Sequence, residues 1–138
     1  MAVDIMPHTL DAAFSTAFLI TGVIHTAETA VIDGIAACED LSPRGILIEA
    51  VRCALGRCER PTQGVYELEW LPPELQSLFR LQPLPRHCFV LRILLNLSPQ
   101  TCAELLRISG IDFEGALHAA LIELLHVERS HGLGQFHG

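Results

Sequence analysis

The amino-acid sequence predicts an all-α protein. Half of its 138 residues are apolar, only 6% are aromatic, and the mean hydropathy is +0.38. The apolar residues are mostly Leu, Ile, Val and Ala, and Leu and Ala have high helix propensity. They recur at three- and four-residue steps, and Ser-Pro pairs that start helices stand at Ser42 and Ser98. We therefore expect about six or seven helices and no strand.

Three helices are predicted in the first part of the chain. The first runs from about Leu10 to Ile20 and ends at Thr21-Gly22, because Gly adopts the left-handed conformation that closes a helix. The second covers about His25 to Glu39, and Ser42 caps a third helix over Pro43–Arg57. The apolar face of the second helix comprises Ala27, Ala30, Val31, Gly34, Ile35 and Cys38.

Four further helices are predicted in the second part. Pro residues open a short helix over about Leu71–Arg80 and a strongly apolar one over Pro85–Asn96. A Ser-Pro cap starts a third helix over about Ser98–Arg107. The hydroxyl of Ser109 and the carboxylate of Asp112 are offered to free amides at the start of the last helix, which covers about Gly110–Glu128. The buried face expected for this helix comprises Phe113, Leu117, Ala120, Leu121, Leu124 and Leu125.

Composition divides the chain into two bundles. Pro, Gly and charged residues are concentrated over 58–70, and we treat Glu67 and Glu69 there as ordinary surface acids. The domains expected are a helical bundle over 1–60, a linker over 61–70 and a second bundle over 71–138. The second bundle ends in a loose Gly- and His-rich tail over 130–138.

The charge balance argues against a protein that depends on phosphate contacts. Sixteen acidic residues stand against nine basic ones, for a net charge of −7, and every basic residue is Arg. Nucleic-acid-binding domains usually carry a basic surface. The five cysteines are odd in number and form no C-x-x-C pair, so we expect reduced thiols. The start of the chain lacks the positive segment of a secretory signal, and we expect a cytoplasmic protein.

No pattern in the sequence predicts an enzyme, a cofactor or a metal. A nucleophile with its base and orienting group is absent, as is a G-x-x-x-x-G-K phosphate loop. His126, His131 and His137 could approach Cys53 or Cys58, but their spacing is irregular for metal ligands. We expect Cys53 in the core and no metal site.

The second half resembles region 4 of bacterial sigma factors of the extracytoplasmic-function type. The resemblance covers LPRHCFVLRILLNLSPQTCAELLRISGIDFEGALHAALIELL, residues 84–125, whose Ser98–Glu128 part has a helix-turn-helix outline. The first half is more loosely similar to region 2, through FLITGVIHTAETAVIDGIAAC, residues 18–38.

The resemblance implies roles for three groups of residues. The helix that faces DNA in the family would present Asp112, Glu114, Ala116, His118 and Ala119. Phosphate contacts would come from Arg86, Arg92 and Arg107, and the face toward RNA polymerase would include Ala27, Glu28 and Asp33.

The departures from the family pattern decide the interpretation. Glu114, Ala116 and Ala119 stand where the family places cations, and Arg107 stands where a Gly is usual, which predicts a turn under slight strain or one of altered geometry. We expect Glu114 and Ala116 to face solvent and Ala119 to be partly covered. Apolar residues on faces otherwise expected to be exposed indicate a protein partner or a homodimer; they are Ile32, Ile48 and Ile122.

The sequence therefore predicts a sigma-factor-like transcription regulator that acts mainly through protein contacts. Its partner would be RNA polymerase, an anti-sigma-like protein or a second copy, with weak or absent DNA binding and no membrane. The alternative is a functional DNA-binding sigma factor that directs RNA polymerase to a promoter. That function would require DNA contacts from four side chains, those of Arg86, Arg92, Arg107 and His118.

Overall fold

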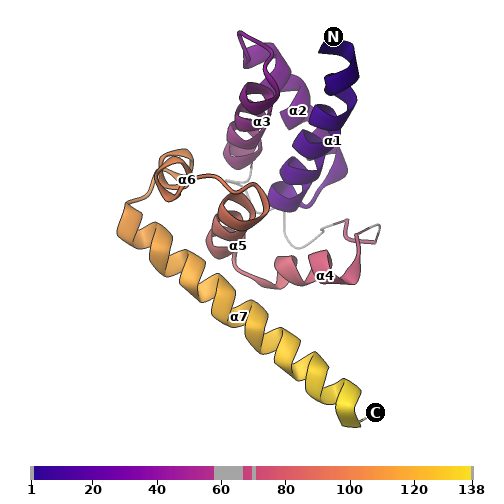
Figure 1. Ribbon diagram of the computed structural model, residues 1–138, viewed down its shortest axis with the longest axis vertical. Helices are drawn as coiled ribbons and strands as arrows, with labels where there is room; N and C mark the ends of the chain where they lie inside the picture. The colour runs from indigo at the N-terminus through magenta and orange to yellow at the C-terminus, as the bar shows by residue number, and fades with distance from the viewer. Residues whose placement is uncertain (1, 58–66, 70, 138) are drawn as a thin grey trace. The chain divides into compact units, whose positions relative to one another are not determined.

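The computed structural model describes the backbone of residues 2–57, 67–69 and 71–137, with side chains over 8–57, 67–69 and 71–126. Within these ranges every regular element is helical, which confirms the all-α prediction (Figure 1). The chain forms two compact units, Met1–Trp70 and Leu71–Gly138. Each unit has its own set of buried side chains.

The Met1–Trp70 unit is a three-helix bundle. It consists of α1 (Ala2–Thr21), α2 (Ile24–Ala37) and α3 (Pro43–Arg57), and each helix packs against the other two (Figure 1). A Cβ added at Gly34 in α2 would lie 2.6 Å from the backbone nitrogen of Ala50 in α3. The two helix backbones therefore approach closely. The fully buried residues of the bundle are mostly small: Ala13, Ala17, Phe18, Ile20, Ala27, Ala30, Ile46, Ala50, Val51 and Ala54.

Local signals set most boundaries in this unit. Gly22 has a positive φ of 74° and follows the last residue of α1, as predicted. α3 covers the predicted residues, and the N–H of Gly45 donates to the hydroxyl of Ser42 at 3.0 Å. α1 differs because it begins at Ala2 rather than near Leu10.

Glu67 brings the chain back to the α1–α2 turn. Its N–H donates to the carbonyl of Gly22 at 2.8 Å, and its carboxylate accepts from the N–H of Ile24 at 2.7 Å. Ile24 is the first residue of α2, where backbone N–H groups lack partners within the helix. Glu67 is exposed, as expected of a surface acid, but its carboxylate also caps a helix that begins 43 residues earlier in the chain.

The Leu71–Gly138 unit is arranged around α5 (Pro83–Phe89), which contacts the elements on both sides of it in sequence and α7 (Gly110–His137). Phe113 of α7 is buried, and α7 also packs against α6. The remaining elements are α4 (Pro73–Gln76), the 3₁₀ helix η1 (Ser77–Arg80), the π-helix η2 (Val90–Leu94) and α6 (Pro99–Leu106).

The segment predicted as one helix over Pro85–Asn96 is not a regular α-helix throughout. After α5 the chain forms η2, in which the N–H of Leu95 donates to the carbonyl of Val90, five residues earlier, at 3.0 Å. A π turn holds more residues than an α turn, so it breaks the 3.6-residue pattern. A regular helix was expected to bury Ile93 and Leu94 on one apolar face with Phe89 and Val90, but Ile93 and Leu94 are exposed.

α7 is longer than predicted. It runs from Gly110 to His137, and its C-terminal part extends beyond α5 (Figure 1). The backbone of residues 130–137, expected to form a loose tail, is helical. Each residue added to an existing helix gains a backbone hydrogen bond, which offsets the low propensity of Gly132 and Gly134.

Candidate functional site

The turn between α6 and α7 is built by side-chain caps on both helices. The hydroxyl of Ser98 accepts from the N–H of Thr101 at 3.2 Å at the start of α6. The hydroxyl of Ser109 accepts from the N–H of Asp112 at 3.0 Å at the start of α7. Both capping predictions are confirmed. A short helix, a three-residue turn and a long helix follow one another over Pro99–His137.

Arg107 ends α6 in a strained conformation. Its φ and ψ are 58° and 44°, in the left-handed region where a Cβ is unfavourable. The N–H of the next residue, Ile108, donates to the carbonyl of Ala103 at 3.1 Å, which closes the helix as a Gly usually does. The strain predicted at Arg107 is confirmed.

α7 has two apolar faces. Phe113 and Ala120 are buried within the unit, whereas Ile111, Ile122 and Leu125 are exposed by 83%, 54% and 60%. The expectation that Leu125 lies on the buried face was wrong. At about 100° per residue, these three exposed side chains lie within roughly 60° of one another, on the side opposite Phe113 and Ala120. We call this exposed strip, formed by Ile111, His118, Ile122 and Leu125, the outward face of α7.

The residues expected to face DNA do not share one surface. Asp112 and Ala119 lie on one flank of the outward face, and Glu114 lies on the other. Ala119 is exposed and Ala116 is half-buried, the reverse of the prediction for this pair. Ala116 is closer to the buried side because it lies three residues after Phe113 and four before Ala120. The exposed members of the set are Asp112, Glu114, His118 and Ala119.

Two of the three Arg side chains expected to contact phosphate interact with other residues of the Leu71–Gly138 unit. Arg86 is 1% exposed, and its guanidinium lies 4.5 Å from the centroid of the Phe79 ring, so its assignment to phosphate was wrong. Arg92 is half-buried and donates to the side chain of Asn96 at 3.2 Å. Among the three, Arg107 alone is exposed.

The residues expected to face RNA polymerase are divided between core and surface. Ala27 is completely buried among α1, α2 and α3, so its side chain cannot contact a partner and that assignment was wrong. Glu28 is exposed. Asp33 is half-buried and forms an ion pair with Arg57 of α3, which joins two helices of the bundle.

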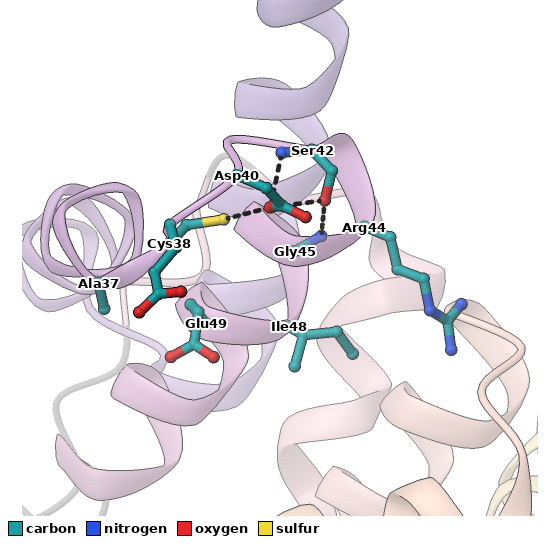
Figure 2. Close-up of a pocket in the computed structure, with 9 residues that line it drawn as sticks. Ala37, Cys38, Asp40, Ser42, Arg44, Gly45, Ile48 and Glu49 are labelled. Atoms are coloured by element: carbon teal, nitrogen blue, oxygen red, sulfur yellow. Dashed lines mark hydrogen bonds between the residues drawn. The ribbon is translucent and has the colours of Figure 1, made fainter.

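The α2–α3 turn borders an open depression of about 610 Å³ (Figure 2). The carboxylate of Asp40 accepts from the N–H and the hydroxyl of Ser42, both at 3.1 Å, and from the thiol of Cys38 at 3.3 Å. These donors, with the backbone N–H of Ser42 first, hold the pKa of Asp40 below its ordinary value. The Arg44 side chain points away from the Asp40 carboxylate (Figure 2). The three hydrogen bonds that this carboxylate accepts from Cys38 and Ser42 link the two ends of the turn and stabilise it.

Sequence reasoning used only one part of this network. It identified Ser42 as a helix cap and missed Asp40. The available signal was the Asp-x-Ser-Pro pattern at 40–43, because an Asp side chain commonly bonds the backbone two residues later.

The cysteines of the two units differ in exposure. Cys88 and Cys102 are fully buried, and burial, followed by the neighbouring Cys102, raises the pKa of Cys88 to about 11. Burial also raises the pKa of Cys53, which is half-buried. Such protonated thiols are weak nucleophiles and metal ligands.

No metal centre is formed by the residues that the structure describes, since none of their His, Cys, Asp and Glu side chains gather in groups of three or more suited to a metal ion. His126 is exposed. The side chains of Cys58, His131 and His137 lie outside the described residues.

Within the described part of the chain, no helix has both the length and the apolar character needed to cross a membrane. Comparison of the chain with protein-family models, curated proteins and solved structures finds no match.

Proposed function

We propose that this protein is a sigma-factor-like regulator of transcription that acts through protein contacts and does not read DNA. The observation that carries the proposal is the surface of α7. Its outward face combines exposed Ile111, Ile122 and Leu125 with acidic flanks. The sequence contains no Lys or Arg from Ile108 to Glu128. A helix that binds DNA needs cations near phosphates, whereas exposed apolar side chains gathered on one side of a helix are typical of protein interfaces.

The capped α6–turn–α7 segment supports the transcription context, because a short helix, a tight turn and an exposed second helix form the outline of DNA-binding helix-turn-helix proteins. In this proposal the scaffold is retained and its surface chemistry has changed from phosphate binding to protein binding. The protein acts in the cytoplasm, without a cofactor and without catalysing a reaction.

The first test measures DNA binding by fluorescence anisotropy with duplex DNA at low salt, where electrostatic affinity is greatest. We expect no binding by the wild-type protein at micromolar concentration. The double variant Ala119→Arg with Glu123→Lys changes the charge of α7 by three units. Two new phosphate contacts should raise the affinity by about one to two decades and steepen its salt dependence.

A matched control places the same change of charge on the other unit. Asp11 and Ser15 are exposed and four residues apart on α1, so Asp11→Lys with Ser15→Arg also adds three positive charges. This control should not gain comparable affinity. Wild-type binding at micromolar concentration would instead establish the alternative, a working DNA-binding sigma factor. Equal gains in both double variants would show that α7 is not presented as a recognition helix.

The second test identifies protein partners by affinity capture from a cell lysate followed by mass spectrometry. We expect RNA polymerase subunits or a transcription regulator to be captured by the wild-type protein. Ile122→Asp places a charge on the outward face and should abolish that capture, because charged residues are depleted at interface cores. Recovery of neither class of protein would contradict the proposed function.

A further inference from the structure

The outward face of α7 is shaped to receive another helix. Its four residues occur at steps of seven, four and three, so they form a nearly straight strip along the helix. From Ile111 to Leu125 the strip is about 21 Å long at 1.5 Å per residue. The opposite side of α7, which includes Phe113 and Ala120, packs against α5 and α6, so the strip is a second apolar face.

Carboxylates lie at unequal distances from this strip. At about 100° per residue, Glu114 lies about 20° beyond one edge of the strip, and Asp112 and Glu123 lie about 80–100° beyond the other edge. All three side chains are exposed, and no cation from α7 lies among them. An occupant of the strip therefore encounters Ile111, Ile122 and Leu125, with His118 between the first two, and the nearest negative charge at Glu114.

We infer that the occupant of the outward face of α7 is a basic amphipathic helix of another protein. Such a helix has one apolar stripe flanked by Lys or Arg, which complements both the apolar strip and the carboxylates beside it. A second copy of this chain is a poor complement, because its own α7 would bring carboxylates against carboxylates and each chain carries a net charge of −7. This inference names the partner class of the surface used in the proposed function and therefore rests on that proposal.

The test uses synthetic peptides with the purified full-length protein. The probe is a fluorescent helical peptide of about 15 residues, which matches the length of the strip, with Leu along one stripe and Lys on both flanks. Two control peptides replace Lys by Glu or scramble the order of the same residues. We expect binding of the Leu/Lys helix alone, with an affinity that falls as salt increases.

Two variants locate the binding surface. Ile122→Ser removes an apolar contact from the outward face and should weaken binding by about tenfold. Ile32→Ser is the matched control, because Ile32 is an exposed Ile, 65% accessible, on α2 of the other unit. It should leave the affinity unchanged. Both substitutions are at exposed positions, and circular dichroism checks that each variant remains folded.

A third variant tests the carboxylates beside the strip. Glu114→Gln with Glu123→Gln should weaken binding by several-fold and flatten its salt dependence, because two negative charges are lost. Binding of the Glu peptide or of the scrambled peptide with the same affinity would overturn the inference, as would equal losses for Ile122→Ser and Ile32→Ser. If sedimentation shows that the wild-type protein is a dimer and that Ile122→Ser is a monomer, the inference is overturned, and the occupant of the outward face is a second copy of this chain.

The two proposals fail in different ways. If the Leu/Lys peptide does not bind but Ile122→Asp still abolishes capture of a transcription protein, the partner is not a basic helix and the proposed function stands. If wild-type protein binds duplex DNA, the proposed function fails whatever the peptide does.

Discussion

In the Met1–Trp70 unit each helix packs against both of the others, whereas in the Leu71–Gly138 unit the elements gather around α5 and α7 leaves one face uncovered. The first unit packs largely through Ala and Gly, with backbones in close approach. Both units bury a large aromatic side chain, Phe18 in the first and Phe113 in the second, but the second also buries the Arg86 guanidinium. The first unit should therefore be sensitive to added volume, and the second to changes in charge and exposure.

The distribution of exposed apolar side chains follows the same division. Among the described residues, two large exposed hydrophobic side chains lie in the first unit and six in the second. The second unit therefore carries most of the exposed apolar side chains on which the proposed protein partner would bind. The six are Leu84, Ile93, Leu94, Ile111, Ile122 and Leu125.

The largest expected effect concerns Gly34. In Gly34→Ala the new Cβ would lie 2.6 Å from the nitrogen and 2.8 Å from the Cα of Ala50, so α2 and α3 must separate. We expect a loss of stability of about 2–3 kcal/mol, measured by urea denaturation followed by circular dichroism. Gly56→Ala on α3 is the control, because no atom lies within 4 Å of its added Cβ. It should stabilise by about 0.5–1 kcal/mol, and equal effects would disprove the close packing.

The next effect concerns Cys88 and alkaline pH. The pKa of its thiol is raised from 9.0 to about 11, first by burial and then by Cys102. Between these pH values the folded state holds more protons than the unfolded state, so the free energy of unfolding falls as pH rises from about 9 to 11. A shift of this size corresponds to about 2–3 kcal/mol.

Denaturation at several pH values measures this loss. The chain has no Lys and one Tyr, so the other groups that titrate in this range are mainly thiols, and burial also raises the pKa values of Cys53 and Cys102. Cys88→Ala should flatten the dependence on pH. Cys53→Ala, at a half-buried thiol of the first unit, should change the slope less. The assignment fails if the wild type is equally stable at pH 9 and pH 11.

A smaller effect, of opposite sign, is expected at Arg107. Its left-handed backbone is unfavourable for a residue with a Cβ, so Arg107→Gly should stabilise the second unit by about 0.5–1 kcal/mol. Thermal denaturation measures the change. Arg107→Ala removes the same charge but keeps the Cβ, and it should give no such gain. If both variants are more stable than the wild type, the gain in stability comes from loss of the Arg107 side chain and not from relief of backbone strain.

The smallest effect is expected at Glu67. Glu67→Gln weakens a charge-assisted hydrogen bond to the N–H of Ile24 and should cost about 0.5 kcal/mol. Glu69→Gln, at another exposed acid nearby, should be neutral. Denaturation of both variants under the same conditions compares them. Equal values would show that the capping contact contributes no stability.

The sequence predicts the features that depend on local chemistry. Ser42, Ser98 and Ser109 identify helix starts because a hydroxyl next to free amides acts without help from distant residues. The π turn of Val90–Leu94 depends on how its side chains pack against the rest of the unit. The spacing of apolar residues in the sequence does not predict such a turn. The Glu67 cap was missed for a similar reason, since its partner lies 43 residues away.

The candidate site was predicted less well, and two residues show why. Ala27 belongs to the apolar stripe of its helix, so periodicity placed it correctly in the core while the family resemblance placed it on a surface. Arg86 precedes Phe89 and Val90 by three and four residues, a spacing that puts it on a buried face. In both cases the helical pattern was a better guide to exposure than the residue type.

The hydrogen bonds of Glu67 also have a mechanical consequence. They attach the chain to Gly22 and Ile24 just before it leaves the first unit. A pull on the chain beyond residue 69 is therefore borne first at the junction between α1 and α2, and not at the C-terminal end of α3. These hydrogen bonds transmit the force to the α1–α2 junction and not to α3. Tension applied through the second unit should therefore open that junction before it unwinds α3.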